Sequence, residues 1–191
     1  QIKSLVEGML MGEDPRRVTG LWKRMVDRAF KAGHDGVIND AISVLDVALW
    51  DIKAKYNDEP LWKTLGGSNP KVHAYASGLD SPLSDDGIED WYGMMAADWG
   101  FKGGKLKVGL DQDADLRRIG RMKKGLEQAT DKPLLYIDAN EVWNPKMAIR
   151  KVREMEEQFD IAWVEEPARR WDFLGLRRIS DQIKAPVCAG E

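Results

Sequence analysis

The chain has 191 residues, of which 43% are hydrophobic and 32% are charged, and its formal net charge is −3. This composition is typical of a globular protein with enough length for one good core, or for a domain and a half. The mild, mixed charge argues against nucleic acid as a partner. No apolar run approaches the roughly 18 residues of a membrane span, so no membrane partner is expected either.

Cysteine and histidine are scarce. Cys188 is the single cysteine, which excludes an internal disulfide and suits a cytoplasmic protein. The two histidines, His34 and His73, are too few for a histidine-rich zinc site.

The first third of the chain is predicted to be helical. Apolar residues follow helical spacing from Ile2 onward, with no cap before them. Asp14-Pro15 is expected to cap and open a second helix, which Gly33 closes. A third helix is predicted from about residue 39 to 56, and a short helical piece over 60–65.

From Lys71 onward, strands are predicted to alternate with helices. The predicted strands are 72–77, the segment around 105–107, 134–138, 161–165 and 186–191. The predicted helices between them are 88–99, 113–128, 144–159 and 172–183. Five strands alternating with four helices predict an α/β fold with a parallel sheet, and a (β/α) barrel is the natural completion.

Both ends of the chain look cut. The sequence begins inside a helix, and the last predicted strand ends at Glu191 with no helix to cover it. A sheet that stopped there would have an open edge. We therefore expect this sequence to be an interior portion of a larger protein.

Carboxylates end three consecutive predicted strands. Asp138, Glu165 and Glu191 follow one another at intervals of 27 and 26 residues, the length of one strand plus one crossover helix. The ends of parallel strands meet at one edge of the sheet, where ligands gather. Hard oxygen ligands favour Mg²⁺, or Mn²⁺, over zinc. A metal site is therefore expected at this edge.

Two lysines lie on a neighbouring strand. Lys105 and Lys107 are two residues apart and share one face, whereas Leu106 and Val108 share the other and are expected to pack on the outer helices. Two inward lysines would repel each other and lose hydration, which is expected to lower their pKa. The alternative is that both lie at the rim as solvated charges.

Strand parity separates the remaining candidates. Glu165 is expected on the inward face with Trp163, whereas Glu166 is expected to make a structural hydrogen bond. Asn140 is either a donor to a bound substrate or a plain loop residue. Cys188 is most simply a buried strand residue.

Together these motifs resemble the enolase superfamily, and within it the mandelate racemase/muconate lactonizing enzyme family. The motifs are Lys105-Leu106-Lys107, Asp138-Ala139-Asn140, Glu165-Glu166-Pro167 and Ala189-Gly190-Glu191. The last two are closer to the mandelate racemase group than to the muconate-lactonizing group, which typically has Glu-Gln-Pro and an aspartate as third ligand. The segment 41–51 also resembles the family's capping-domain helix.

The resemblance implies a modified (β/α)₇β barrel with an α+β capping domain. Residues 1–66 would be the helical part of the N-terminal capping domain. Residues 67–191 would be the first part of the catalytic barrel, truncated after its fifth strand. We expect the full-length protein to be a homo-oligomer.

The resemblance also implies a chemistry. Mg²⁺ would be held by Asp138, Glu165 and Glu191, and the α-proton of a small-molecule carboxylate substrate would be abstracted to form an enediolate. Lys107 would be the base and Lys105 would stabilise charge on the carboxylate. The family's His–Asp pair would lie beyond Glu191.

Three functions remain open. The favoured one is a metal-dependent lyase, a dehydratase acting on a sugar acid or another hydroxy acid. A racemase, epimerase or cycloisomerase would share the first half-reaction. The third is a non-catalytic relative, or a fragment without activity.

Overall fold

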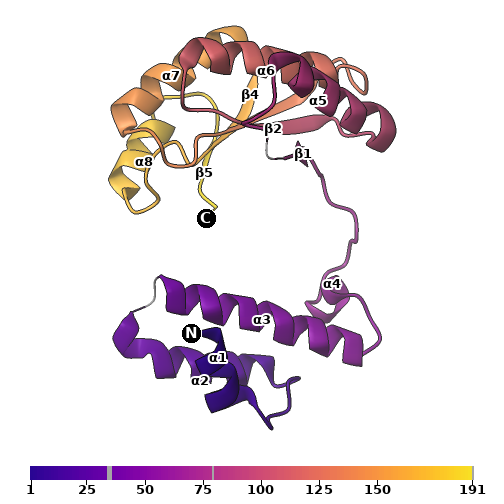
Figure 1. Cartoon of the computed structure of the whole chain (residues 1–191), viewed down its shortest axis with the longest axis vertical. Helices are drawn as coiled ribbons and strands as arrows, with labels where there is room; N and C mark the ends of the chain where they lie inside the picture. The colour runs from indigo at the N-terminus through magenta and orange to yellow at the C-terminus, as the bar shows by residue number, and fades with distance from the viewer. Residues whose placement is uncertain (34–35, 79, 191) are drawn as a thin grey trace. The chain divides into compact units, whose positions relative to one another are not determined.

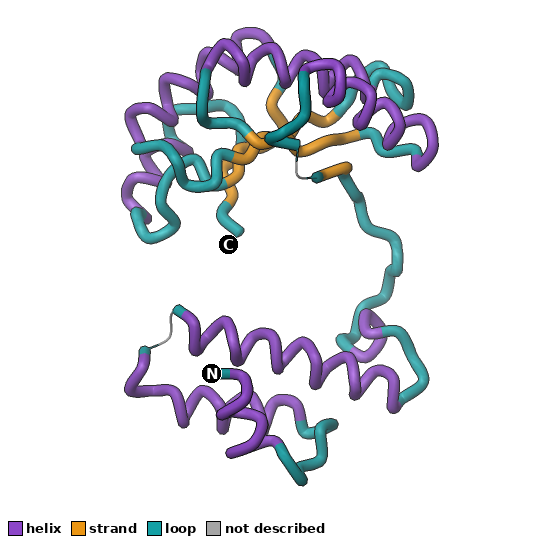
Figure 2. Tube along the Cα trace, in the orientation of Figure 1, coloured by secondary structure: helices purple, strands orange, loops and turns teal. Residues whose placement is uncertain are grey.

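The computed structural model describes residues 1–33, 36–78 and 80–190. The chain forms two compact units, Gln1–Val72 and His73–Glu191 (Figures 1 and 2). Within the described ranges, every helix is too short or too polar to span a bilayer.

The first unit is built from helices. It contains α1 (Ile2–Leu5), the π-helical turn η1 (Val6–Leu10), α2 (Val18–Ala29), the 3₁₀ turn η2 (Phe30–Ala32), α3 (Val37–Tyr56) and α4 (Leu61–Thr64). Helices α2 and α3 lie side by side in Figure 1. Their apolar stripes bury a common core, which contains Leu5, Val18, Leu21, Met25, Ile42, Leu45 and Leu49.

Helix α2 begins at Val18, three residues after the predicted start at Pro15. The carboxylate of Asp14 does not cap the helix, because it accepts hydrogen bonds from the backbone N–H and guanidinium of Arg16 at 2.7–3.1 Å. Residues 14–17 therefore form a turn held by this aspartate. Gly33 ends the segment as predicted, with a φ of 86° that favours glycine.

The second unit is a parallel sheet with strand order β1-β2-β3-β4-β5. The strands are β1 (Ala76–Ser77), β2 (Gly103–Lys107), β3 (Leu134–Asp138), β4 (Ile161–Glu165) and β5 (Val187–Cys188). The connecting helices are α5 (Asp85–Trp99), α6 (Gln112–Leu126), α7 (Pro145–Gln158) and α8 (Phe173–Ser180). Figure 1 shows these helices along the outer side of the curved sheet. The predicted α/β class and its alternation of strands and helices are confirmed.

Each of the four crossover helices begins at a side-chain cap. Ser84, Asp111, Asn144 and Asp172 each accept a hydrogen bond from the backbone N–H three residues later. Such caps satisfy N–H groups that the first helical turn leaves without a partner. The caps therefore set where each strand's following loop ends.

The two outer strands are shorter than predicted. β1 has two residues instead of the six predicted over 72–77, and β5 has two instead of the six predicted over 186–191. Within the described sheet each of them pairs with one neighbour only. A strand with one partner has fewer ladder hydrogen bonds to keep it extended.

The buried core determines which residues of β2, β3 and β4 face the helices and which face the inner side of the sheet. Leu106, Ile137 and Val164 are opposite one another on β2, β3 and β4, and all three are fully buried under the helices. Because successive residues of a strand face opposite sides, the next residues along these strands face the inner side of the sheet.

Candidate active site

The inner row consists of Lys107, Asp138 and Glu165. The strand register places Lys107 opposite Asp138, and Asp138 opposite Glu165. All three are the last residues of their strands. The predicted inward parity of the lysines and of Glu165 is thereby confirmed.

Asp138 lies at the centre of this row and is 1% exposed. Its Oδ2 is 2.5 Å from Lys107 Nζ and 3.2 Å from Lys105 Nζ, and its Oδ1 accepts the backbone N–H of Asn140 at 2.9 Å. Glu165 Oε1 is 2.6 Å from Lys105 Nζ. The Lys105 side chain is only 11% exposed. This excludes the alternative in which both lysines are solvated rim charges.

The electrostatics of Lys105 differ from the prediction. Burial disfavours the charged amine and by itself would lower its pKa. Hydrogen bonds to Glu165 and Asp138 outweigh burial, so the pKa of Lys105 is raised. The predicted lowering is therefore wrong for Lys105, because the carboxylates contribute more than repulsion between the two lysines. Asp138 has a lowered pKa in turn, since its hydrogen bond with Lys107 helps to overcome the effect of burial.

The loops that follow β3 and β4 contain backbone strain. Asn140, Glu141 and Glu166 have φ values of 43°, 62° and 48°. Residues other than glycine rarely adopt this left-handed region, and such positions cluster at functional sites. Here these residues redirect the backbone out of β3 and β4 just after Asp138 and Glu165.

Glu166 makes the structural hydrogen bonds that the sequence predicted. It is 1% exposed, and its Oε1 accepts the Gly190 N–H at 3.2 Å. Its Oε2 accepts the Asn140 side-chain amide at 3.4 Å. Asn140 therefore lies between the ends of β3 and β4, beside the inner row.

Glu141 is a residue that the sequence reasoning missed. Its Oε1 accepts the backbone N–H of Arg170 at 2.7 Å and the guanidinium Nε at 2.6 Å. These hydrogen bonds lower the pKa of Glu141 to about 2. The pair joins the loop after β3 to the loop after β4. Its two members are 29 residues apart, and no local pattern relates them.

Cys188 and Glu191 are the two remaining candidates from the sequence. Cys188 is in β5, partly buried, with its Sγ 4.0 Å from Glu165 Oε2. Burial and the nearby Glu165 charge raise the pKa of this thiol to about 11. Glu191 lies outside the described residues, so its place in the ligand set stays a prediction. Among the described residues, no group of three or more His, Cys, Asp or Glu side chains is arranged to hold a metal ion.

An aromatic cluster occupies the inner face one step further into the sheet. Tyr136 and Trp163, two residues before Asp138 and Glu165, have ring centroids 4.1 Å apart. Tyr75 joins them at 5.0 and 5.4 Å. The cluster forms an apolar floor beneath the charged row. In the described part of the chain, the buried Trp163 Nε1 has no hydrogen-bond partner.

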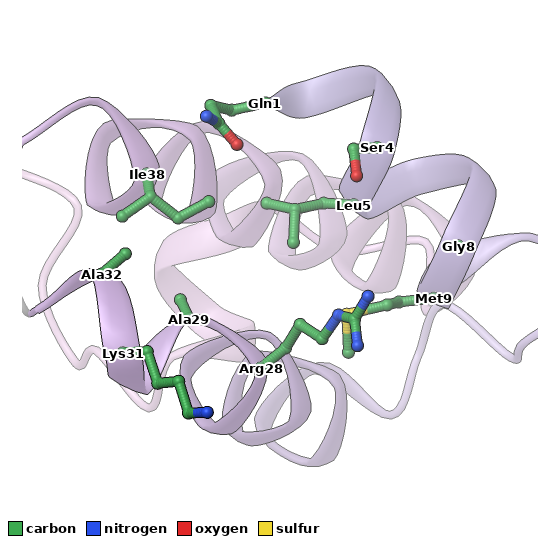
Figure 3. A pocket seen from close by; sticks show the side chains of 10 residues that line it. All are labelled: Gln1, Ser4, Leu5, Gly8, Met9, Arg28, Ala29, Lys31, Ala32 and Ile38. Carbon is green, nitrogen blue, oxygen red and sulfur yellow. The ribbon is translucent and has the colours of Figure 1, made fainter.

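The first unit has a hollow of its own, with a volume of about 370 Å³ (Figure 3). Arg28 and Lys31 are among the ten described residues that line it, and none of these ten is acidic. The described part of its lining therefore offers no carboxylate for a metal ion or for proton transfer. The row at the end of β2, β3 and β4 is the better candidate for an active site.

Comparison with protein-family models assigns both parts of the chain. Residues 90–191 match the family described as enolase C-terminal domain-like. Residues 1–66 match the mandelate racemase/muconate lactonizing enzyme N-terminal domain. The two matches cover most of the sequence.

Individual relatives agree with these matches. The chain is 35% identical to 3,6-anhydro-alpha-L-galactonate cycloisomerase of Streptomyces coelicolor, over 97% of this chain and 50% of the relative. It is 36% identical to L-talarate/galactarate dehydratase of Salmonella typhimurium, over 95% of this chain and 45% of the relative. The chain thus spans about half the length of these curated relatives.

A solved structure matches the whole chain. It is a racemase from Streptomyces coelicolor with bound magnesium, with a TM-score of 0.86 and 34% sequence identity. The match covers 100% of this chain and 57% of the racemase chain. The fold of each of the two units is therefore similar to the corresponding part of that protein.

Proposed function

The chain belongs to the mandelate racemase/muconate lactonizing enzyme family of the enolase superfamily, and on this premise we propose that it is part of a Mg²⁺-dependent dehydratase. The substrate would be a sugar acid or a related hydroxy acid, and the first step would be abstraction of the proton next to its carboxylate. The observation that carries the proposal is the row of Lys107, Asp138 and Glu165. Together with Lys105 beside it, its lysine amines and carboxylates form ion pairs with N–O distances of 2.5–3.2 Å.

The carboxylates in this row have the chemistry that Mg²⁺ requires. Asp138 and Glu165 are opposite each other on adjacent strands, and both supply hard oxygen ligands. We propose that they hold the cation together with Glu191, with Mn²⁺ as the alternative metal. Bound there, the cation would supply positive charge to stabilise the enediolate.

The lysines would carry the proton chemistry. We assign Lys107 as the base, so that its Nζ takes the α-proton and the electron pair of the broken C–H bond moves into the enediolate. Lys105, flanked by Asp138 and Glu165, would stabilise negative charge on the substrate carboxylate. Asn140 is close enough to the row to bind a substrate oxygen through its amide. The aromatic floor would keep bulk water from the inner side of the site.

The domain assignment is part of the proposal. Residues 1–66 would be the helical part of the capping domain, and residues 67–191 the first part of the barrel. The division of the structure between Val72 and His73 supports this assignment.

An isomerase is the second candidate. It is supported by the cycloisomerase and by the magnesium-bound racemase among the relatives. A racemase, epimerase or cycloisomerase would use the same first half-reaction, and would differ in where the proton or bond is restored.

The test is incubation of the protein with Mg²⁺ and a panel of aldonic and aldaric acids in D₂O. A dehydratase eliminates water from C2 and C3 of its substrate. The resulting enol becomes a 2-keto-3-deoxy acid, which is detected as its semicarbazone. An isomerase incorporates deuterium at the α-carbon without forming a keto acid. Absence of both deuterium and keto acid across the panel would contradict the proposed function and favour a non-catalytic relative.

A further inference from the structure

The edge of β2 that faces β1 is only partly paired. β1 ends at Ser77, opposite Lys105, so it provides no partner for the last residues of β2. Backbone groups along a strand alternate between its two sides. The N–H of Val108 donates to the backbone carbonyl of Asp138 on the β3 side. The backbone groups of Lys105 and Lys107 therefore face the side on which β1 has stopped.

Two buried side chains replace the missing strand on this side. The Lys107 N–H donates to the carboxylate of Asp80, at 3.3 Å to Oδ1 and 3.4 Å to Oδ2. The Lys105 carbonyl accepts the hydroxyl of Tyr92 at 2.5 Å. The same hydroxyl is 3.1 Å from Asp80 Oδ2, so the three groups form one connected network.

This network is enclosed and firmly anchored. Asp80 is 1% exposed, and Tyr92 on α5 is fully buried. Burial raises the pKa of Tyr92, which keeps its hydroxyl protonated as a donor. The guanidinium of Arg118 on α6 donates to the carbonyls of Asp80 and Leu83 at 3.0 and 2.9 Å, and it lies 3.8 Å from the Asp80 carboxylate.

Burial of a carboxyl group is costly unless its hydrogen bonds compensate. The described contacts of the Asp80 carboxylate are with the backbone N–H of Lys107 on β2, with Tyr92 and with Arg118. These contacts anchor the backbone at the end of β2, where Lys107 Nζ lies 2.5 Å from Asp138 Oδ2.

We propose that Asp80 is a positioning residue, which fixes the end of β2 and thereby places the Lys107 amine for proton transfer. The inference rests on the proposed function, because it takes Lys107 to be the base. Reacting groups lose roughly 10²-fold in rate for a displacement of about 1 Å. Loosening of this backbone would therefore reduce proton transfer without altering the carboxylates on β3 and β4.

The variants separate positioning from general loss of stability. Asp80→Ala removes the acceptor of the Lys107 N–H. Asp80→Asn keeps an acceptor for that N–H and adds a donor for the Tyr92 oxygen, so it should rescue. Tyr92→Phe removes the bond to the Lys105 carbonyl. Val152→Ala, at a fully buried position on α7, is the control for destabilisation alone.

The first readout is independent of activity. Amide hydrogen exchange at Lys107, measured by NMR, should accelerate roughly 2- to 10-fold in Asp80→Ala, the range expected for loss of one hydrogen bond. Leu106, whose N–H faces β3, should show no local acceleration once global stability is matched to Val152→Ala. Unchanged exchange at Lys107 would overturn the proposal.

The second readout is kinetic. Asp80→Ala and Tyr92→Phe should lower kcat for α-proton exchange by roughly 10- to 10²-fold, with KM and Mg²⁺ affinity within about twofold of the wild type. Asp80→Asn should stay within about threefold in kcat. A loss in Asp80→Ala no larger than in Val152→Ala would also overturn the proposal. A wild-type protein without any proton exchange would instead contradict the proposed function, and the amide measurement would still decide whether Asp80 holds Lys107.

Discussion

Replacement of Lys107 by alanine is expected to remove proton transfer and leave the fold in place. Asp138 is almost fully buried, so the loss of a cation beside it has to be examined first. A buried charge left without a partner costs about 3–5 kcal/mol. Here the carboxylate keeps Lys105 at 3.2 Å and the Asn140 N–H at 2.9 Å. We therefore expect a cost of about 1.5–3 kcal/mol, that of one hydrogen bond to a charged group.

The effect on the reaction should be larger. Loss of a general base lowers the rate roughly 10²–10⁴-fold, which corresponds to about 2.7–5.4 kcal/mol in the activation barrier. Mg²⁺ affinity should change little, because in this account Lys107 is not a ligand. Lys102→Ala is the matched control, since this lysine is exposed and immediately precedes the first residue of β2.

The assay is solvent-deuterium exchange at the α-carbon, followed on both configurations of a candidate hydroxy acid. For a dehydratase, exchange with the substrate should fall by the stated factor. For an isomerase with two bases, exchange should disappear for one enantiomer and survive for the other. Undiminished exchange with both configurations would remove Lys107 from the mechanism.

The remaining predictions concern stability. The pKa of Glu141 is about 2 in the folded protein, against an ordinary value of 4.5. Its pairing with Arg170 therefore stabilises the protein above about pH 4.5, and this stabilisation is lost as the pH falls toward 2. The difference in urea midpoint between wild type and Glu141→Gln should shrink as the pH falls through this window, and a constant difference would contradict the assignment. On α6, an added Cβ at Gly125 would lie 2.6 Å from the Glu89 carbonyl, so Gly125→Ala should destabilise the protein by about 1–3 kcal/mol. Gly120→Ala on the same helix meets nothing closer than 3.7 Å and should stabilise it by up to about 1 kcal/mol in urea unfolding; equal effects at both positions would refute the packing argument.

Strands β3 and β4 were predictable from sequence to the residue. Both are short apolar runs that end in a carboxylate, and a capped helix follows β3 after a short loop. These are local signals, and the parity rule then places Asp138, Glu165 and the two lysines on one face. The start of α2 was not predictable in this way, because the Asp14 carboxylate accepts hydrogen bonds from Arg16 instead of from the first N–H groups of the helix.

The electrostatics of the site depend on contacts between distant residues. Lys107 and Asp138 are 31 residues apart, and Lys105 and Glu165 are 60 apart. Periodicity predicts that these side chains face inward, but not which pairs come within 3 Å. The pKa of Lys105 is raised because of those short distances. The prediction from sequence, which considered only burial and repulsion between the lysines, therefore had the wrong direction.

The contacts of Asp80 could not be predicted from the sequence either, because no local pattern marks this residue. It follows a strand that is only two residues long, and its partners come from β2, α5 and α6. Only the folded topology brings these groups together.

A crystal structure of the protein with Mg²⁺, or with the anomalous scatterer Mn²⁺, tests the central claim most directly. We expect a single cation at the end of β3 and β4, with Asp138 and Glu165 oxygens about 2.1 Å from Mg²⁺ and Glu191 as the third carboxylate. A cation bound elsewhere, or Asp138 and Glu165 still paired with the lysines and no metal between them at millimolar Mg²⁺, would contradict it.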